Sequence, residues 1–348
     1  TKKIEENISI IGDKIMIERL FDNLLNNAMK FTKDKINVKL YSEDEKCVLE
    51  VEDNGIGISE QDKELIWKRF YQVNDSRNKK INKEREIMIT FAITTTTKLA
   101  GLALYENEKV LGKIHIEVAK SHSTTILEQI DCLLKWTGKK LTDIKNVVVS
   151  IGPGSFTGVR IAISVVKGIF FGREDVTFYE VNELDALGYQ AFFNICATCD
   201  NFFNKKIYAL IDSRKEKVYF AAYKIFENKL ELVEDYKVAK LDDVILEINN
   251  KKNEKEDKNK ESKQDKEDRE ENKNNEIYMI GDAVFNYKEK IKENLGQSIH
   301  LFEEKNLKID VATFVQMMLA GKLEDKKTDI FNLRPNYLEK SQAERDKK

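Results

Sequence analysis

A strand, a glycine-rich turn and a helix follow one another directly in the middle of this chain, and this order constrains its fold most. The apolar run 147–151 leads into residues 152–160 (GPGSFTGVR), and an apolar stretch continues to Phe171. Glycine permits positive φ and close backbone approach, and a helix N-terminus presents unpaired N–H groups. The turn is therefore either a cradle for a phosphate or carboxylate or a tight structural turn. Its candidate residues are Gly152, Gly154, Ser155, Thr157, Gly158 and Arg160.

The elements predicted from Met88 onward occur in a recognisable order. Three short strands precede a helix, then the strand, the glycine turn and a second helix follow, which is the βββαβα order of a ribonuclease-H-like unit. A similar order begins again at Ile207, so we predict an α/β chain with an actin-like fold of two ribonuclease-H-like lobes. The predicted strands are Ile89–Ile93, Leu102–Tyr105, Lys109–Val118 and 147–151 in the first lobe, with a helix at Ser123–Trp136, and Ile207–Ile211, Val218–Tyr223, Leu230–Val233 and 277–280 in the second.

Changes in composition divide the chain into domains. A seam near residues 80–88 separates an N-terminal domain, 1–84, from a main domain, 88–348, whose lobes span about 88–200 and 201–348. Residues 249–276 contain no apolar side chain, so they cannot offset the entropy of ordering and are expected to form a disordered insertion. A nucleic-acid-binding tail is the alternative, but its acids and bases are mixed and their fields largely cancel.

The composition excludes several classes of protein. The chain has 59 Lys and Arg against 61 Asp and Glu, a net charge of −2, which gives no global attraction to nucleic acid or membrane. No apolar run approaches the roughly 20 residues of a membrane span, and no signal peptide is recognisable. Four scattered cysteines indicate a reducing compartment. We therefore expect a cytoplasmic protein.

The N-terminal domain carries polar residues in a pattern suited to a nucleotide. A helix predicted at 13–32 places two asparagines and a lysine near one face, and a strand at 47–51 leads into Asp53 and alternating glycines. A carboxylate can accept a hydrogen bond from an exocyclic amine, and glycines let a base approach the backbone. An amide can ligate Mg²⁺, and a lysine can reach phosphates. A capped helix followed by a glycine turn is the structural alternative.

Three segments of this domain resemble the ATP-binding domain of sensor histidine kinases, a GHKL-type α/β sandwich. Residues 21–32 (FDNLLNNAMKFT) look like the N box, 53–58 (DNGIGI) like the G1 box and 67–72 (WKRFYQ) like the F box. The resemblance covers about residues 4–80 and implies ATP and Mg²⁺ as ligands. The implied ATP-binding residues are Asn23, Asn27, Lys30, Asp53, Gly55 and Gly57, with Asp53 on the adenine amine, Asn27 on Mg²⁺ and Lys30 at phosphate.

The kinase resemblance is incomplete. The dimerisation helix with its phosphoacceptor histidine and the second glycine box are missing, so we do not expect autophosphorylation. We interpret the domain as a truncated kinase end, a partial sandwich joined to the main domain by gene fusion, decay or an artefact. An ATP-binding signalling protein of the sensor-kinase type is the alternative function.

Four segments of the main domain resemble the TsaB (YeaZ) family of bacterial tRNA-modification proteins. They are 92–101 (AITTTTKLAG), 121–123 (SHS), 150–160 (SIGPGSFTGVR) and 334–344 (RPNYLEKSQAE). The resemblance implies the actin-like fold and a noncatalytic role as partner of TsaD, which makes N6-threonylcarbamoyladenosine (t6A) in tRNA. It also implies a TsaE-like ATPase as a further partner, contact with tRNA only through the complex, a homodimer when TsaD is absent, and no membrane.

The residues themselves also favour a noncatalytic role. Thr94 stands at the predicted end of the first strand, where kinases of this fold need a carboxylate to position metal and water. The paired histidines of TsaD-type enzymes lie one helical turn apart, whereas His115 and His122 are predicted on different elements. Ser155 has no base evident in the sequence, and Val159 after Gly158 excludes a Walker loop. We assign no catalytic residue.

The helix after the glycine turn is apolar nearly all round, whereas a helix on the face of a sheet needs only one apolar stripe. The surplus predicts burial on a second side, either under the second lobe or in a partner interface shared with the helix at 123–136. The family resemblance favours the partner interface. Its predicted residues are Ile126, Ile130, Ile163, Val166, Ile169 and Phe170.

Overall fold

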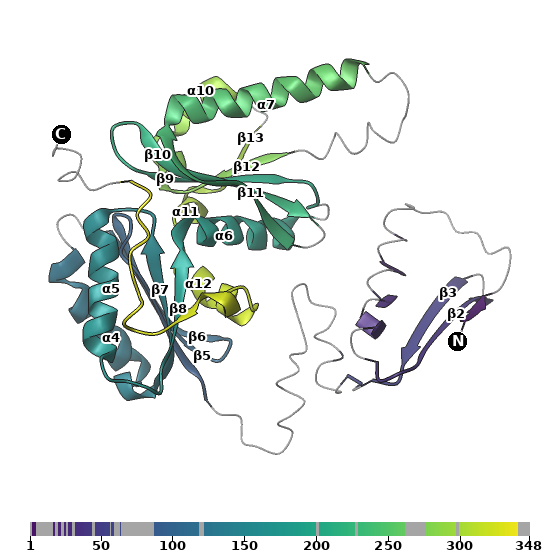
Figure 1. Cartoon of the computed structure of the whole chain (residues 1–348), viewed down its shortest axis with the longest axis horizontal. Helices are drawn as coiled ribbons and strands as arrows, with labels where there is room; N and C mark the ends of the chain where they lie inside the picture. Colours follow the sequence, from purple (N-terminus) through teal and green to yellow (C-terminus); the bar gives the residue numbers. More distant parts are fainter. Residues whose placement is uncertain are drawn as a thin grey trace. The chain divides into compact units, whose positions relative to one another are not determined.

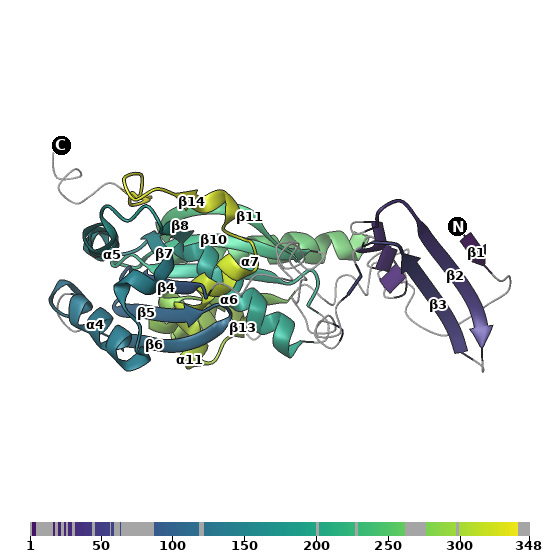
Figure 2. The same cartoon turned by 90° about the horizontal axis from the view of Figure 1, so that it is seen from below.

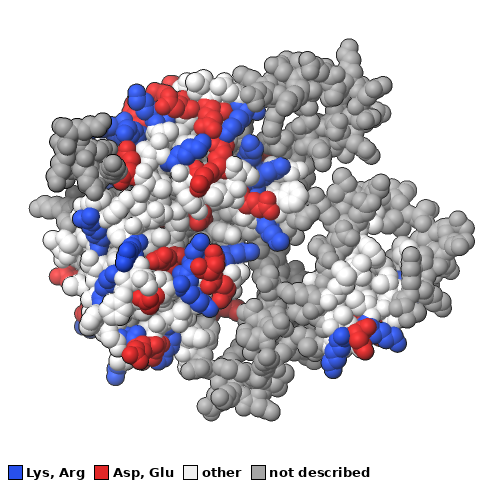
Figure 3. Space-filling model, in the orientation of Figure 1, with Lys and Arg blue, Asp and Glu red and all other residues white. Residues whose placement is uncertain are grey.

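The computed structural model describes two compact units, Thr1–Arg85 and Glu86–Lys348, which are considered separately below. The described residues are 2–4, 17, 20–21, 24–25, 27–29, 32–43, 46–55, 57–58, 63, 87–117, 122–199, 202–226, 229–261, 276–296 and 299–339. Within them, no helix is both long enough and apolar enough to cross a bilayer. On the face of the second unit drawn in Figure 3, positive and negative side chains are interspersed.

The first unit contains a three-stranded sheet in the order β1-β2-β3. Strand β1 (Lys2–Ile4) runs parallel to β2 (Ile36–Glu43), and β2 pairs antiparallel with β3 (Lys46–Asp53). The strand predicted at 47–51 is therefore confirmed as part of β3. Of the predicted helix at 13–32, the described residues 17, 20–21, 24–25 and 27–29 are helical. Asn23, Lys30 and the segment 67–72 lie outside the described residues.

Lobe one of the second unit is built on a six-stranded sheet in the order β14-β8-β7-β4-β5-β6. Helices α4 (Ile126–Thr137) and α5 (Phe156–Phe170) lie on the same face of this sheet in both views (Figures 1 and 2). The central strand β4 is buried on both faces, because Phe91 and Ile93 pack under these helices while Ala92 packs on the opposite side. The strands are β4 (Ile89–Thr94), β5 (Leu99–Glu106), β6 (Lys109–Glu117), β7 (Ile144–Gly152), β8 (Thr177–Asn182) and β14 (Lys327–Thr328).

Lobe two is built on a five-stranded sheet in the order β11-β10-β9-β12-β13. Helices α7 (Leu241–Glu261), α9 (Asp282–Asn286) and α10 (Lys288–Leu295) cover one face (Figure 1). The strands are β9 (Lys206–Asp212), β10 (Lys217–Phe226), β11 (Lys229–Lys240), β12 (Ile277–Ile280) and β13 (Ile299–Leu301). The predicted repetition of three strands, a helix and a further strand is confirmed in both lobes, and two such lobes make the actin-like fold.

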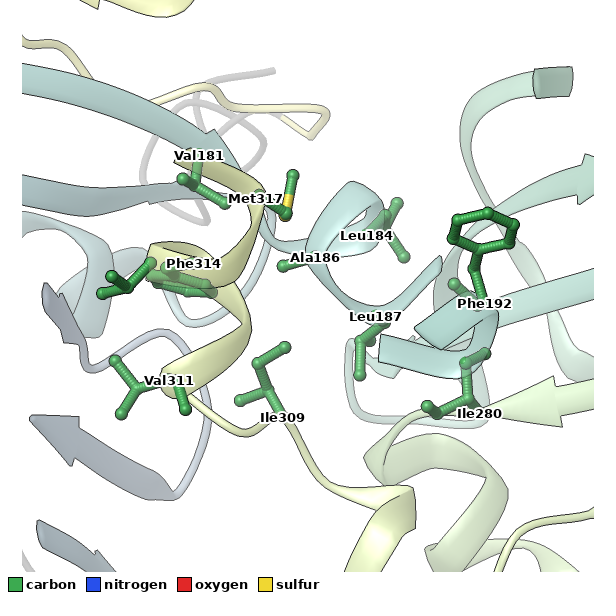
Figure 4. Close-up of a cluster of buried hydrophobic side chains, with 14 of the residues drawn as sticks. Val181, Leu184, Ala186, Leu187, Phe192, Ile280, Ile309, Val311, Phe314 and Met317 are labelled. Atoms are coloured by element: carbon green, nitrogen blue, oxygen red, sulfur yellow. The ribbon is translucent and has the colours of Figure 1, made fainter. Parts of the chain in front are cut away.

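Helix α6 (Glu183–Thr198) forms the centre of the second unit. It packs against strands of both sheets and against α12 (Ala312–Leu319), and Figure 4 shows Phe314 and Met317 of α12 facing the same cluster as Leu187. Apolar side chains on several sides of α6 are buried there, as expected for a helix enclosed by two sheets. The short helices η1 (His122–Thr124), η2 (Leu141–Asp143), α11 (Glu304–Leu307) and η4 (Glu324–Lys326) complete the unit.

The predicted disordered insertion is partly wrong. Order was expected to end near residue 249, but α7 continues to Glu261. Lys and Glu are good helix formers, and oppositely charged pairs one turn apart stabilise a helix already nucleated by a packed first half. Lys251 forms such a pair with Glu247 (Nζ–Oε1 2.8 Å) and also contacts Glu234 on β11 (2.6 Å). Residues 262–275 lie outside the described residues.

The predicted partner interface is also largely wrong. Ile126, Ile130, Ile163, Val166 and Phe170 are all buried in the lobe-one core between the two helices and the sheet, and Ile169 is half-buried against it. The surplus apolar residues of α5 are instead Ile161, Val165 and Ile169, which are half-buried and spaced by one helical turn. Apolar composition therefore identified the helix correctly but assigned the wrong face.

Candidate functional site

The glycine turn joins the end of β7 to the start of α5, and its glycines are required by close packing. A Cβ on Gly154 would lie 2.5 Å from the Thr96 carbonyl oxygen, and one on Gly158 would lie 1.9 Å from the Thr95 oxygen. The Ser155 N–H donates to the Thr96 oxygen (2.6 Å), and the Ser155 hydroxyl accepts from the Gly158 N–H at the N-terminus of α5 (3.3 Å). The turn is therefore locked against the connection between β4 and β5.

The C-terminal segment 334–339 crosses the outer side of this turn. The Asn336 N–H donates to the Ile151 oxygen (2.8 Å), and the Asn336 oxygen lies 3.2 Å from where a Cβ on Gly152 would be. The Tyr337 ring stacks on Phe156, with centroids 4.4 Å apart. Arg160 packs its guanidinium over the Phe156 ring, 4.0 Å from its centroid, and donates from Nε to the Tyr337 hydroxyl (2.6 Å).

The same segment continues to lobe two. Glu339 accepts a hydrogen bond from Lys217 Nζ (2.9 Å) at the start of β10. The segment thus holds the glycine turn of one lobe and the β9–β10 connection of the other. Residues of this chain therefore cover the Gly152 and Phe156 side of the turn, whereas Ser155, Thr157 and Arg160 stay exposed.

A buried carboxylate that the sequence analysis did not single out lies behind the turn. Glu183, the first residue of α6, accepts hydrogen bonds from Thr94 Oγ1 (3.2 Å) and Ser150 Oγ (2.5 Å). Burial raises the pKa of Glu183 to about 7, although the hydroxyl donors oppose the shift. Its position directly after the alternating strand Thr177–Asn182 was the only signal in the sequence.

A second buried acid belongs to lobe two. Asp282, at the start of α9, accepts from the Asp212 N–H (2.9 Å). Burial raises its pKa to about 6, and the nearby Asp212 charge adds to the shift. The charge of Asp282 also contributes to the raised pKa of Glu183. Glu183 is fully enclosed and is not placed to act on a ligand from solvent, whereas Asp282 is half-buried.

The structure places the remaining candidates as follows. Thr94 ends β4, as predicted, and its hydroxyl is engaged with Glu183. His115 lies on β6, where its Nε2 accepts from the Val311 N–H (3.2 Å), and His122 lies in η1, so the two are on different elements, as predicted. Across the described ranges, no group of three His, Cys, Asp or Glu side chains is arranged to hold a metal ion.

In the first unit, part of the predicted ATP site can be tested for fit. Asp53 ends β3 and is exposed, with its Oδ1 accepting from the Gly55 N–H (2.7 Å). Gly57 has φ +69° and open space where a Cβ would be. Asn27 is helical and exposed. Asp53 and Gly57 fit the adenine end of a nucleotide, because the Gly55 N–H holds Asp53 in place and Gly57 leaves room beside it.

Comparison with known proteins assigns the second unit. A family model described as "TsaD: tRNA N6-adenosine threonylcarbamoyltransferase" matches residues 71–347. The chain belongs to this family. Within it, the chain is 34% identical over 142 residues to the tRNA threonylcarbamoyladenosine biosynthesis protein TsaB of Escherichia coli K12, covering 40% of this chain and 57% of that protein. It is 25% identical over 259 residues to TsaB of Bacillus subtilis 168, covering 74% of this chain and 96% of that protein.

Solved structures agree with the fold of this family member. YeaZ from Pseudomonas aeruginosa aligns with a TM-score of 0.52 at 20% identity and covers 72% of this chain and 100% of its own. A second P. aeruginosa structure, titled as an uncharacterised protein with similarity to peptidase YeaZ, aligns with a TM-score of 0.53 at 19% identity and covers 73% and 100%. These likenesses support the two-lobed architecture.

The N-terminal part of the chain is similar to other proteins. A model described as histidine kinase-, DNA gyrase B- and HSP90-like ATPase matches residues 12–126. The sensor protein CiaH of Streptococcus pneumoniae is 37% identical over 73 residues, which are 20% of this chain and 16% of CiaH. The predicted resemblance of this domain to sensor histidine kinases is thereby confirmed for a short segment.

Proposed function

We propose that the second unit acts as a noncatalytic partner of a TsaD-like protein in forming t6A in tRNA. Its relatives from E. coli and B. subtilis are named for threonylcarbamoyladenosine biosynthesis, and the second of these alignments spans nearly the whole relative. A TsaE-like ATPase would join the pair, and tRNA would be contacted through the complex. In the absence of TsaD, the same surface would support a homodimer.

The enclosed carboxylate behind the glycine turn is the observation that carries the noncatalytic assignment. Asn336 and Tyr337 lie against the turn, and the carboxylate behind it, Glu183, is bonded to hydroxyls and fully enclosed. A phosphoryl or acyl transfer needs a reachable charged group or metal at this point of the fold. Thr94 supplies neither, so catalysis is assigned to the partner.

The partner surface proposed here is a half-buried flank of α5 beside the lobe-one core, rather than the buried side of the helix. Ile161, Val165 and Ile169 form a half-buried apolar row, and Leu127 of α4 is 57% exposed. A row of this kind offers an apolar core for an interface while the core-facing row keeps the lobe folded.

Pairing is tested by size-exclusion chromatography of the chain mixed with a TsaD-like protein. The Val165→Asp variant is expected to lose the complex and keep the wild-type circular dichroism spectrum. Val166→Asp is the matched control: it puts a charge into the core and is expected to unfold lobe one. Full complex formation by Val165→Asp would show that the partner surface does not lie on this row of α5. Absence of complex with the wild-type chain, or t6A formation by the chain alone, would overturn the function.

ATP binding by the first unit is the second candidate function, because Asp53 is exposed at a strand end beside open glycine backbone. The residues named for it are Asp53, Gly55 and Gly57 at the base, with Asn27 as the Mg²⁺ ligand. Titration of the full chain with a fluorescent ATP analogue should show Mg²⁺-dependent binding that Asp53→Asn abolishes. Glu52→Gln, one residue earlier on β3, should leave binding unchanged. Equal binding by both variants would reject the site.

A further inference from the structure

A cavity of about 230 Å³ lies within the second unit, away from the glycine turn. Its walls come from α6, from strands β8, β10 and β11, and from the segment that includes α12 and η4, and β8 contributes the carboxylate of Glu180. These elements lie together beside α6 in Figure 1. Neither the proposed partner surface nor the nucleotide residues contribute to this cavity, so the function proposed above leaves it unexplained.

Asp185 is the chemical centre of the cavity wall. Its Oδ1 accepts from the Tyr223 hydroxyl (2.8 Å) and the Tyr236 hydroxyl (2.9 Å), and Tyr236 also reaches Oδ2 (2.9 Å). Burial raises the pKa of Asp185, and the two phenols oppose this by donating to the ionised form. Within the described ranges this carboxylate forms no ion pair, although the charge of Lys326 at the cavity rim acts to lower its pKa.

The position of Tyr223 is fixed by the helix behind it. A Cβ on Gly188 of α6 would lie 2.9 Å from the Tyr223 ring, so only glycine lets the ring lie this close to the helix. Glycine inside a helix costs about 1 kcal/mol relative to alanine. Tyr189 supplies a third phenol ring to the lining. The polar wall is therefore held in place before any ligand arrives.

We propose that this cavity binds the ammonium group of a small organic ligand, with Asp185 as its counter-charge. A partly buried carboxylate without a cationic partner is stabilised by a cation, and phenol rings around it add a cation–π attraction. Lys322 and Lys326 stand at the rim and are exposed, so solvent weakens their charges, although the charge of Lys326 still acts to lower the pKa of Asp185. A ligand with an anionic tail is therefore accommodated, whereas an extended polycation is not.

The test is calorimetric titration of the full chain with n-butylammonium, n-butanol, butyrate and γ-aminobutyrate. Binding is expected for the two ammonium compounds only. Asp185→Asn keeps the shape and one acceptor oxygen of the side chain. It is expected to lower the affinity for butylammonium at least about tenfold. The control, Asp325→Asn, removes an exposed carboxylate at the rim and should change the affinity little.

Several outcomes would overturn the proposal. Equal binding of butanol would show a merely apolar cavity, and binding of butyrate alone would assign the site to the rim lysines. Unchanged affinity in Asp185→Asn, or no binding of any probe to the wild-type chain, would also reject it. Gly188→Ala provides an independent check. Its added Cβ should displace the Tyr223 ring and lower the affinity for butylammonium, while the Asp185 charge remains.

Discussion

At the residue scale, the buried acids show how burial and hydrogen bonding compete. Glu183 is enclosed behind the glycine turn, where Thr94 and Ser150 donate to it, yet burial still raises its pKa. A hydroxyl at position 94 is thus required by the carboxylate on α6, which explains why threonine is compatible with the fold there. An aspartate would place two carboxylates in contact.

Glu183 predicts a specific dependence of stability on pH. Its pKa is about 7 in the folded chain against an ordinary value of 4.5, so the folded state retains a proton that the unfolded state loses within this window. Stability should therefore fall as pH rises from about 4.5 to 7. Glu183→Gln removes this penalty, and its advantage over wild type should grow by on the order of 3 kcal/mol across the window.

Urea unfolding at several pH values measures this difference. The Asp282→Asn variant serves as a comparison, because the pKa of Asp282, raised from 3.8 to about 6, gives a dependence of the same sign that ends at lower pH. A pH-independent difference between Glu183→Gln and wild type would contradict the burial argument.

At the element scale, packing fixes different parts of the glycine motif and of α5 in different ways. Its first turn is fixed by contact with the β4–β5 connection, its inner side forms the lobe core, and its half-buried row of Ile161, Val165 and Ile169 packs against the edge of that core. The C-terminal segment 334–339 then covers the turn. The glycine motif therefore forms a closely packed contact between lobe one and that segment.

Two glycines of α5 give a matched prediction. Gly158→Ala should destabilise the chain by several kcal/mol, because its Cβ would lie 1.9 Å from the Thr95 oxygen and the turn would have to open. Gly168→Ala has no atom within 4 Å of its Cβ and should stabilise the helix by up to about 1 kcal/mol. Thermal unfolding of both variants tests this, and similar melting temperatures would show that the contact is not restrictive.

At the scale of the whole molecule, the division between Arg85 and Glu86 separates two units with different proposed functions. The second unit contains both sheets, the central α6 and the complete set of elements matched to the TsaD-like family. The kinase-like resemblance rests on the first unit. The two proposed functions can therefore be tested independently.

A fragment of residues 86–348 is predicted to fold cooperatively and to pair with a TsaD-like protein as well as the full chain does. Its core clusters are all formed within that range, so removing the first unit exposes none of them. Circular dichroism during thermal unfolding and size-exclusion chromatography check the two statements. Loss of pairing in the fragment would assign the partner surface to the first unit.

The sequence alone determined the order of elements, because alternating or continuous apolar runs and glycine turns are local signals. The four strands predicted in each lobe, the strand at 47–51 and the helix after the glycine turn follow from such patterns, whereas β8, β13 and β14 were not predicted. Thr94 at a strand end and the two histidines on separate elements were also predictable from position along the chain.

The tertiary structure decided what each side chain faces. Val165 and Val166 are adjacent apolar residues on α5. Packing against the sheet buries Val166 and leaves Val165 half-exposed. The carboxylates Glu183 and Asp185 acquired their environments from strands far away in sequence. Asn336 likewise meets the glycine turn only in the tertiary structure, because the two segments lie far apart in the sequence. Local periodicity fixes secondary structure, whereas burial and pKa depend on contacts between distant segments.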